Sequence, residues 1–397
     1  MNESIVIVGA ARTPLGGFQG DFASLAAHDL GGAAIKAAAE RAGQNSRFTP
    51  DLVTEVLFGN CLMAGQGQAP ARQAAFKGGL PNSAGAVTLS KMCGSGMRAV
   101  MFAHDMLVAS SHDVLIAGGM ESMTNAPHLL LKGRSGIRIG HDRVMDHMML
   151  DGLEDAYEAG RSMGTFGEDC AAKYSFSREA QDNFAVASVK RAQAATQSGA
   201  FSAEITPVTV TTRAGAVVVA VDEGPGKIKI DKIPGLKPAF KKDGTITAAS
   251  SSSINDGAAA LVLMRASTAA QLGSQPLARI VAHATHAQAP NWFATAPAGA
   301  VQKLLTKAGW SVKDVDLWEV NEAFAVVPMA LMADLKVPHE IVNVNGGACA
   351  LGHPIGASGA RIVVTLVYAM QARGLKRGVA TLCIGGGEAT AIALELL

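Results

Sequence analysis

One cysteine lies where a helix is expected to begin, a position that suits a nucleophile. Cys93 stands in Lys-Met-Cys-Gly-Ser-Gly, after an apolar stretch and directly before an expected helix. Because the positive end of a helix dipole stabilises a thiolate, we expect the pKa of Cys93 to lie below its ordinary value of about 8.5. Gly94 and Gly96 leave room for a substrate and for backbone N–H groups that point at an oxyanion. A lone cysteine is often a buried structural residue, but the strand–Cys–Gly-x-Gly–helix setting favours the nucleophile.

Two further side chains could move protons beside such a thiol. His353 lies in a glycine-rich loop and precedes Pro354, so it could accept the thiol proton, although a His-Pro pair is also typical of a structural turn. Cys383 ends an expected strand and is followed by three glycines, residues 385–387. Such a run weakens a strand unless something approaches the backbone, which favours a functional Cys383 over a core cysteine.

Asn321 follows an apolar strand and has two possible roles. Its amide could hold a water molecule or a carbonyl oxygen, or it could equally cap a helix that starts near Glu322. The His, Cys, Asp and Glu residues show no spacing typical of a metal site, so we expect no metal.

The elements that would position these residues alternate between apolar strands and Ala-rich helices, which predicts an α/β fold. We expect strands at 5–8, 54–58, 113–117, 315–320 and 379–384, and helices at 30–42, 97–109, 298–309 and 178–197.

An internal repeat indicates a duplication. The segment from Cys93 aligns with the segment from Ile355, which pairs Ser95 with Ser358 and Gly96 with Gly359. We therefore predict an N-terminal α/β half over 1–120, an inserted loop domain over 121–250 and a C-terminal α/β half over 251–397. The insert has a Lys-rich run at 227–242, and inserts over a rigid core often bind substrate.

Composition limits the partners and the compartment. The net charge of +1 argues against a nucleic-acid partner. The longest apolar run, 362–370, is far shorter than the ~20 residues that a membrane span needs. Five cysteines without a Cys-x-x-Cys pair, together with an N-terminal sequence that lacks targeting features, predict free thiols and a cytoplasmic protein.

Taken together, the motifs resemble those of the thiolases over essentially the whole chain. The matching segments are Ala10-Ala-Arg-Thr-Pro, Cys93-Gly-Ser-Gly-Met-Arg-Ala, Gly118-Gly-Met-Glu-Ser-Met, Ile254-Asn-Asp-Gly-Ala-Ala-Ala, Asn321-Glu-Ala-Phe-Ala, Gly352-His-Pro-Ile-Gly-Ala-Ser-Gly and Cys383-Ile-Gly-Gly-Gly. The resemblance implies a duplicated five-layer α-β-α-β-α core with an inserted loop domain. Segments near Ala126 and Asp151 look more like the acetoacetyl-CoA branch of the family.

The resemblance also implies roles for the residues. Cys93 would be acetylated by acetyl-CoA, with His353 as its base, and Cys383 would take a proton from a second acetyl-CoA. The carbanion would attack the acyl-cysteine, a reversible Claisen condensation that gives acetoacetyl-CoA and CoA through ping-pong kinetics. His353 and a water held by Asn321 would stabilise the enolate, and the N–H groups of Cys93 and Gly385 the acyl oxygen. Acyl-CoA is the expected substrate, with no cofactor.

Residues that contact coenzyme A follow from the same resemblance. Ser252 would touch the pantetheine arm, and Lys227 and Lys229 are plausible partners of the phosphates, although a lysine run can also be a solvated surface. The expected lining residues are Leu153, Met163, Ala248, Phe293, Ala323 and Phe324. Low charge content and the resemblance together predict a homotetramer built from dimers.

Departures from the family pattern affect the acyl pocket and the CoA channel. Ala249-Ser-Ser-Ser-Ser stands where Gly-Asn-Ala-Ser-Gly is usual, Ser162 where a histidine is common, and Glu388 where an apolar residue or glutamine is common. A 3-ketoacyl-CoA thiolase of broader chain length therefore stays as an alternative. A condensing enzyme that uses acyl carrier protein is disfavoured by Cys383-Ile-Gly-Gly-Gly, and a non-catalytic binding protein by the presence of Cys93 and His353.

Overall fold

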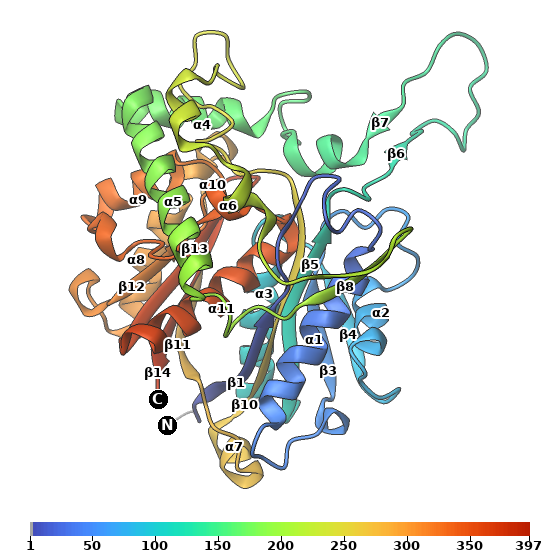
Figure 1. The fold of residues 1–397 in the computed structure, drawn as a ribbon, viewed down its shortest axis with the longest axis vertical. Coiled ribbons are helices and arrows are strands. Elements are labelled where there is room, and N and C mark those ends of the chain that lie inside the picture. Colours follow the sequence, from blue (N-terminus) through green and yellow to red (C-terminus); the bar gives the residue numbers. More distant parts are fainter. Residues whose placement is uncertain (1–2) are drawn as a thin grey trace.

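A mixed sheet of ten strands runs through the molecule in the computed structural model, which describes residues 3–397 (Figure 1). Its strand order is β12-β13-β14-β11-β1-β10-β5-β3-β4, and β2 pairs with β10. The strands are β1 (Ile5–Arg12), β2 (Gly16–Gly17), β3 (Glu55–Gly59), β4 (Gly85–Leu89), β5 (Val114–Ser122), β10 (Asn255–Arg265), β11 (Ala278–Ala287), β12 (Leu317–Val320), β13 (Arg377–Ile384) and β14 (Glu388–Leu396). Two short hairpins lie outside this sheet, β6 (His128–Leu129) with β7 (Met145–Asp146) and β8 (Val208–Thr212) with β9 (Gly215–Val219).

Helices pack on the outer face of each half of this sheet, and two further helices lie between the halves. The α-helices are α1 (Ala27–Gly43), α2 (Pro70–Lys77), α3 (Ser95–Val108), α4 (Met163–Tyr174), α5 (Arg178–Ser198), α6 (Glu223–Lys227), α7 (Ala266–Leu272), α8 (Ala296–Ala308), α9 (Val326–Leu335), α10 (Ala348–Leu351) and α11 (Ile355–Arg373). Short 3₁₀ turns occupy Pro50–Leu52, Ile230–Gly235, Pro290–Thr295, Val312–Asp314 and His339–Ile341, and a π-helical turn occupies Met149–Leu153.

The layers follow from the alternation of side chains along the strands. Val6 and Val8 of β1 pack with α1 and α2 in an outer core, whereas Ile5 and Ile7 pack with α3 and α11 in a central core. In the other half, Val379 of β13 packs with α8 in a second outer core. The result is five layers: helices, half-sheet, central helices, half-sheet, helices. The predicted duplicated α-β-α-β-α core is confirmed.

The two halves of the sheet are joined by a short antiparallel contact. Residues 5–7 of β1 pair with residues 278–280 of β11, which makes one hydrogen-bonded sheet out of two similar half-sheets. Strand β11 of the second half thus pairs with β1 of the first, so each half-sheet covers an edge of the other.

The central helices α3 and α11 cross at the glycines that the repeat pairs. A Cβ atom at Gly359 would lie 2.5 Å from the backbone nitrogen of Met97, and one at Gly96 would lie 2.8 Å from the backbone nitrogen of Ala360. No side chain fits at either position. Since both glycines lie in the first turns of their helices, the crossing brings the two helix N-termini together.

Within residues 3–397, α11 is the one helix with the length and hydropathy of a membrane span. Of its most apolar 18-residue window, 83% is buried inside the fold. Its apolar character is therefore that of a core helix between two half-sheets.

The predicted helices and strands are present, with ends shifted by a few residues, but the division at residue 250 differs from the structure. Strand β10 was not predicted, and it pairs with β1 and β5 over almost its whole length. The N-terminal half therefore takes its central strand from residues 255–265, which the predicted boundary assigns to the other half. This strand is apolar on both faces and lacks the alternation that identifies a half-exposed strand.

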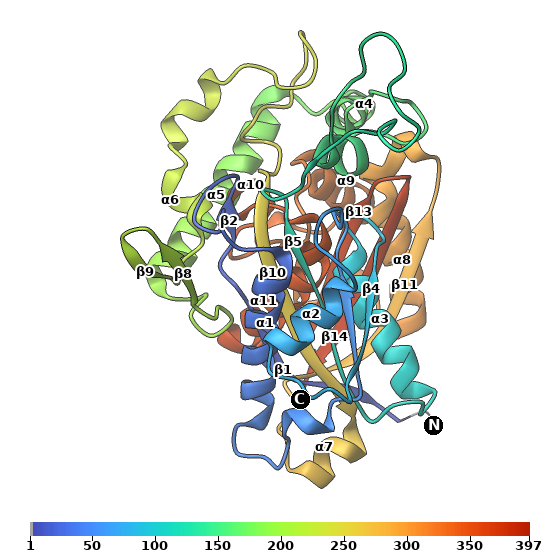
Figure 2. The same cartoon turned by 90° about the vertical axis from the view of Figure 1, so that its right-hand side faces the viewer.

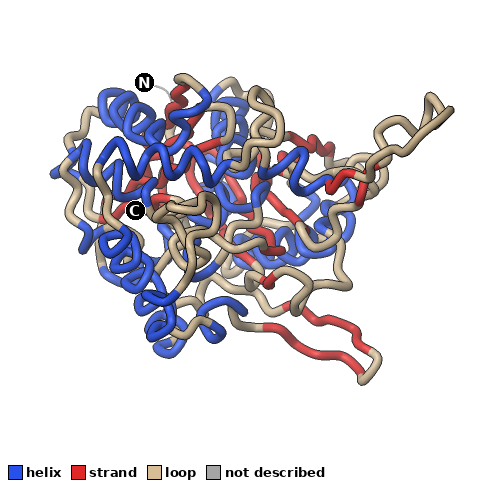
Figure 3. Tube along the Cα trace, turned by 90° about the horizontal axis from the view of Figure 1, so that it is seen from above, coloured by secondary structure: helices blue, strands red, loops and turns tan. Residues whose placement is uncertain are grey.

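The insert spreads over one end of the core. Figure 2 shows α5 and α6 beside the β8–β9 hairpin, and Figure 3 shows two projections from the body, the β6–β7 loop and the β8–β9 hairpin. Helix α5 packs on residues of both halves, among them Leu15 and Leu351.

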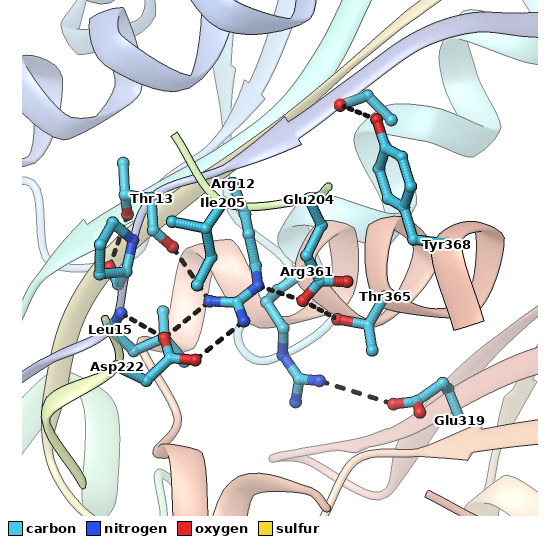
Figure 4. Close-up of polar contacts among 12 residues, drawn as sticks. Arg12, Thr13, Leu15, Glu204, Ile205, Asp222, Glu319, Arg361, Thr365 and Tyr368 are labelled. Atoms are coloured by element: carbon cyan, nitrogen blue, oxygen red, sulfur yellow. Dashed lines mark hydrogen bonds and ion pairs between the residues drawn. The ribbon is translucent and has the colours of Figure 1, made fainter. Parts of the chain in front are cut away.

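A buried ionic network fastens the insert to the core (Figure 4). The Arg12 guanidinium donates to Glu204 at 2.6 Å and to Asp222 at 2.7 Å, and all three side chains are buried. The same Asp222 accepts the backbone N–H of Leu15 at 2.8 Å. Breaking one partner of such a network leaves an unpaired buried charge, so Arg12 of the Ala-Ala-Arg-Thr-Pro motif has a structural role.

Candidate active site

A cavity of about 60 Å³ lies where α3 and α11 begin. It is lined mostly by apolar side chains, with two groups that can do chemistry, the thiol of Cys93 and the imidazole of His353. The lining residues are Met92, Cys93, Gly152, Leu153, Met163, Ser252, Phe293, Ala323, Phe324, His353, Ile355 and Gly385.

The turn that carries Cys93 is held in a strained conformation. Met92, directly before it, has a φ of +46°, which non-glycine residues rarely adopt. The hydroxyl of Ser95 donates to the carbonyl oxygen of Met92 at 2.6 Å and accepts the N–H of Lys91 at 2.8 Å. Cys93 therefore sits on a turn that is held by hydrogen bonds and not on a flexible loop.

The prediction of a lowered pKa for Cys93 is wrong. Burial raises the pKa of this thiol to about 11, although a hydrogen bond from the Gly385 backbone opposes the rise. A helix dipole contributes roughly 0.3–1 kcal/mol, which is less than about one pKa unit, so it does not offset the desolvation of this partly covered thiol. Cys93 is therefore a protonated thiol at neutral pH before substrate binds.

His353 is oriented by a serine one helical turn further on. Its Nδ1 lies 2.5 Å from the hydroxyl oxygen of Ser358, and that hydroxyl donates to the carbonyl oxygen of Pro354 at 2.9 Å. Because a hydroxyl has one hydrogen, satisfying both contacts requires that Nδ1–H of His353 donates to Ser358. Nε2 then has a free lone pair, and this buried atom has no hydrogen-bond partner among the described residues.

Burial also makes His353 a neutral base. It lowers the pKa of His353 to about 3, and the nearby positive charge of Arg361 adds to this effect. The imidazole is therefore unprotonated at neutral pH and can accept a proton at Nε2.

The side chain of Asn321 caps no helix; it is buried and lies close in sequence to the cavity-lining residues Ala323 and Phe324, without lining that cavity itself. Its backbone N–H donates to Thr381 at 3.0 Å, yet neither polar atom of its buried side chain has a partner among residues 3–397. The following helix, α9, begins only at Val326 with Ala325 as its cap, so the capping alternative is wrong. A buried amide without partners is costly unless a ligand or water satisfies it.

Cys383 lies at the end of β13 and is completely buried. It packs in an apolar cluster with Phe293 and Phe324, which line the cavity that Cys383 itself does not line. Burial raises its pKa well above the ordinary value, and the charge of an ionised Cys93 raises it further. The two thiols thus interact electrostatically, and deprotonated Cys383 would be a strong base.

The residues expected to bind coenzyme A divide between two cavities. Six of them line the 60 Å³ cavity with Cys93, namely Leu153, Met163, Ser252, Phe293, Ala323 and Phe324. Ala248, Lys227 and Lys229 line a second cavity of about 650 Å³. Ala248 and Ala249 line the larger cavity and Ser252 lines the smaller one, so the segment 248–252 runs from one cavity to the other.

Comparison with known proteins matches this arrangement. Residues 5–267 match the family model described as thiolase, N-terminal domain, and residues 274–396 match thiolase, C-terminal domain. The chain belongs to the thiolase family.

Its relatives cover the chain from end to end. Acetyl-CoA acetyltransferase 2 of Arabidopsis thaliana is 50% identical, covering 100% of this chain and 98% of the relative, and acetyl-CoA acetyltransferase of Rhizobium meliloti is 49% identical, covering 100% of both. The crystal structure of a thiolase from Ascaris suum in complex with coenzyme A has a TM-score of 0.93 at 40% identity, and that of a Bacillus anthracis acetyl-CoA acetyltransferase has a TM-score of 0.96 at 39% identity, each covering 100% of both chains.

Two buried carboxylates of this thiolase were missed by sequence reasoning. Glu121 accepts the N–H groups of Gly356 at 2.8 Å and Cys61 at 3.0 Å, and so ties the start of α11 to the loop after β3. Glu322 accepts the N–H of Cys349 at 3.0 Å at the start of α10. Glu121 lies in the motif that contains Gly119, and Glu322 directly follows Asn321. A charged residue within an otherwise apolar motif was the sequence signal that could have identified them. Ser358, which orients His353, was recognised only as a repeat position.

The protonation state of Cys93 predicts how it reacts with an alkylating reagent. Because the thiolate is the reactive form, the rate of inactivation by iodoacetamide in the absence of substrate should keep rising with pH to about pH 10, without a plateau near neutrality. The measurement is the pseudo-first-order inactivation rate against pH, with mass spectrometry to locate the label on Cys93. A plateau below pH 8 would show that Cys93 is a stable thiolate.

Proposed function

We propose that this thiolase catalyses the reversible condensation of two acetyl-CoA molecules to acetoacetyl-CoA and CoA through an acetyl-Cys93 intermediate. The observation that carries this proposal is the convergence of Cys93, His353 and the Gly385 backbone on one small cavity. Its full-length relatives are named acetyl-CoA acetyltransferases, and a neighbour was solved with coenzyme A.

In the first half-reaction, Cys93 attacks the thioester carbonyl of acetyl-CoA. With a thiol pKa near 11 and an imidazole pKa near 3, proton transfer in the empty site is unfavourable. The proton therefore moves to Nε2 of His353 as the new S–C bond forms. N–H groups of Cys93 and Gly385 stabilise the oxyanion. The CoA thiolate leaves and takes a proton from Cys383, which becomes a thiolate.

In the second half-reaction, that Cys383 thiolate removes a proton from the methyl group of a second acetyl-CoA. Asn321 and protonated His353 stabilise the enolate oxygen, with a water held by the unpartnered amide of Asn321. The carbanion attacks acetyl-Cys93, a C–C bond forms, and the Cys93 sulfur leaves and regains its proton from His353. This chemistry uses side chains and backbone groups of the chain and calls for no further cofactor.

The size of the cavity supports a short acyl group. The cavity that Cys93 and His353 line holds about 60 Å³, far below the roughly 300–1,000 Å³ of sites for drug-sized ligands, and an adjoining cavity of about 240 Å³ is lined by neither of them. An acetyl group suits this volume better than the long chain of the alternative function, a 3-ketoacyl-CoA thiolase of broad chain length.

The larger cavity is our proposed site for the nucleotide end of coenzyme A. Lys227, Lys229 and Lys232 line it, and their charges would attract phosphates. Lys227 also pairs with Glu223 and is 71% exposed, so Lys229 carries more of the expected interaction. The segment at 248–252 would then guide the pantetheine arm toward Cys93.

We propose a homotetramer built from dimers, and two apolar surfaces support it. The loop between β6 and β7 extends away from the body (Figure 1) and exposes Leu131 at 62%, Ile139 at 96% and Val144 at 64%. The edge strand β4 pairs on one side only and exposes Val87.

All five cysteines are free thiols, which suits the proposed cytoplasmic location.

The covalent intermediate provides the direct test. Brief incubation with acetyl-CoA should leave an acetyl group on the peptide that contains Cys93, detected by mass spectrometry. Cys383→Ala should lose far less in this acetylation, because a thiolate can leave without a proton, than in condensation, where the loss should be at least about 100-fold because general-base catalysis contributes roughly 10²–10⁴-fold. Equal loss of both steps would contradict the role of Cys383.

In thiolysis assays, kcat/KM should fall as the 3-ketoacyl chain lengthens, and a flat series would favour the alternative function.

Charge at the larger cavity should affect binding and not chemistry. Lys229→Ala should raise the KM for acetyl-CoA up to about fivefold, because an exposed ion pair contributes about 1 kcal/mol or less, and should leave kcat unchanged. The KM of the unchanged enzyme should also rise with salt, and less so in the variant. Lys313→Ala, an exposed lysine elsewhere, is the matched control. A KM independent of salt would exclude steering by these lysines.

Replacing apolar residues of the extended loop should change the assembly. The double substitution Leu131→Ser and Ile139→Ser should convert tetramers to dimers in light scattering, with activity per active site retained. A monomer for the unchanged protein would contradict the proposed tetramer.

A further inference from the structure

Outside the active site, three metal-binding side chains converge where α3 meets β11. His104 and Asp105 lie near the end of α3, and His283 lies on β11. Their donor atoms all lie within 4.8 Å of one another. The sequence predicts no such site, because residues 104–105 and 283 are far apart in the chain and only the fold brings them together.

The donor atoms of this cluster lie within about 0.5 Å of the spacing found around a bound metal. Nε2 of His283 lies 2.8 Å from a carboxylate oxygen of Asp105 and 3.3 Å from Nδ1 of His104, and that Nδ1 lies 3.1 Å from the same oxygen. With metal–ligand bonds of about 2.0–2.1 Å, neighbouring ligand atoms of a tetrahedral Zn²⁺ site lie roughly 3.3 Å apart. The three donors thus form one face of such a coordination shell.

The surroundings suit a cation with one open position. The two imidazoles are largely covered, with side chains 18% and 14% exposed, whereas Asp105 is 53% exposed. The rings pack edge to face, with centroids 4.9 Å apart, so their positions are fixed by packing.

We propose that His104, Asp105 and His283 bind a divalent first-row transition metal such as Zn²⁺, with solvent as the fourth ligand. Two imidazoles and one carboxylate are the donor set that such ions prefer. The ion would connect α3 of the first half to β11 of the second. Lys307, whose ammonium group donates to the carbonyl oxygen of His283 at 3.1 Å, places one positive charge nearby and limits the affinity.

Cobalt is the probe, because its visible spectrum reports the ligand type and separates this site from the cysteines. The full-length protein, treated with chelator, is titrated with Co²⁺. We expect about one equivalent to bind with the d–d bands of nitrogen and oxygen ligands and without a thiolate charge-transfer band. Zn²⁺ should then displace it and raise Tm.

Two variants and one control assign the site. His283→Gln and Asp105→Asn should each weaken Co²⁺ binding at least about tenfold and abolish the Zn²⁺-dependent rise in Tm. His112→Gln, whose side chain contacts Thr54 instead, should bind as the unchanged protein does. Asp105→Asn keeps the shape of a half-exposed side chain, so it provides a folded variant if His283→Gln is unstable. Thiolase kcat should stay unchanged in all three.

The proposal would be overturned by Co²⁺ bound only with a thiolate band, by unchanged affinity in both variants, or by no binding at all. In that case, the cluster is a carboxylate hydrogen-bonded by two imidazoles.

Discussion

The close crossing of α3 and α11 is the constraint on which the active site depends. A Cβ atom on Gly96 or Gly359 would overlap the backbone of the other helix, so only glycine at both positions permits this approach. Cys93 and His353 each lie two residues before the start of one of these helices. Because the helices meet at their N-terminal ends, residues that lie far apart in the chain border one cavity. The two helices pack between the two half-sheets, and the half-sheets are joined by the pairing of β1 with β11.

The same burial that assembles the site sets its protonation states. Cys93 and His353 form a neutral pair, thiol and imidazole, since burial penalises the charged form of each. A neutral pair costs less to keep in an apolar cavity than a thiolate–imidazolium pair. In the proposed mechanism, charge develops only when a substrate places its carbonyl against the N–H groups of Cys93 and Gly385. Activation would then be coupled to substrate binding, which would protect the thiol from reacting without it.

Much of this arrangement could be predicted from the sequence, because local patterns determine local structure. The strand and helix positions, the repeat and the residues that border the cavity all lie in short motifs with clear periodicity or glycine spacing. The sequence could not place β10, whose apolar faces show no alternation. Nor could it give the pKa of Cys93, since a helix N-terminus is visible in the sequence whereas the depth of burial is a property of the whole fold. The unpartnered amide of Asn321 and the cluster at His283 likewise exist only once distant segments meet.

The duplication explains why equivalent residues of the two halves have similar roles, and differences in burial explain where those roles differ. Ser95 and Ser358 occupy equivalent positions, and each fixes a catalytic turn through its hydroxyl. The repeat also aligns Arg98 with Arg361, and these two arginines differ. Arg98 lies over the ring of Phe102, whereas Arg361 is buried with no hydrogen-bond partner among the described residues and with Glu319 at 3.5 Å. Burial raises the pKa of Glu319 to about 8, so this partner is largely protonated at neutral pH. The charge of Arg361 is then left to act on His353 and helps keep that base neutral. Arg98 thus packs on its own helix, whereas Arg361 adds its charge to the larger effect of burial in lowering the pKa of His353.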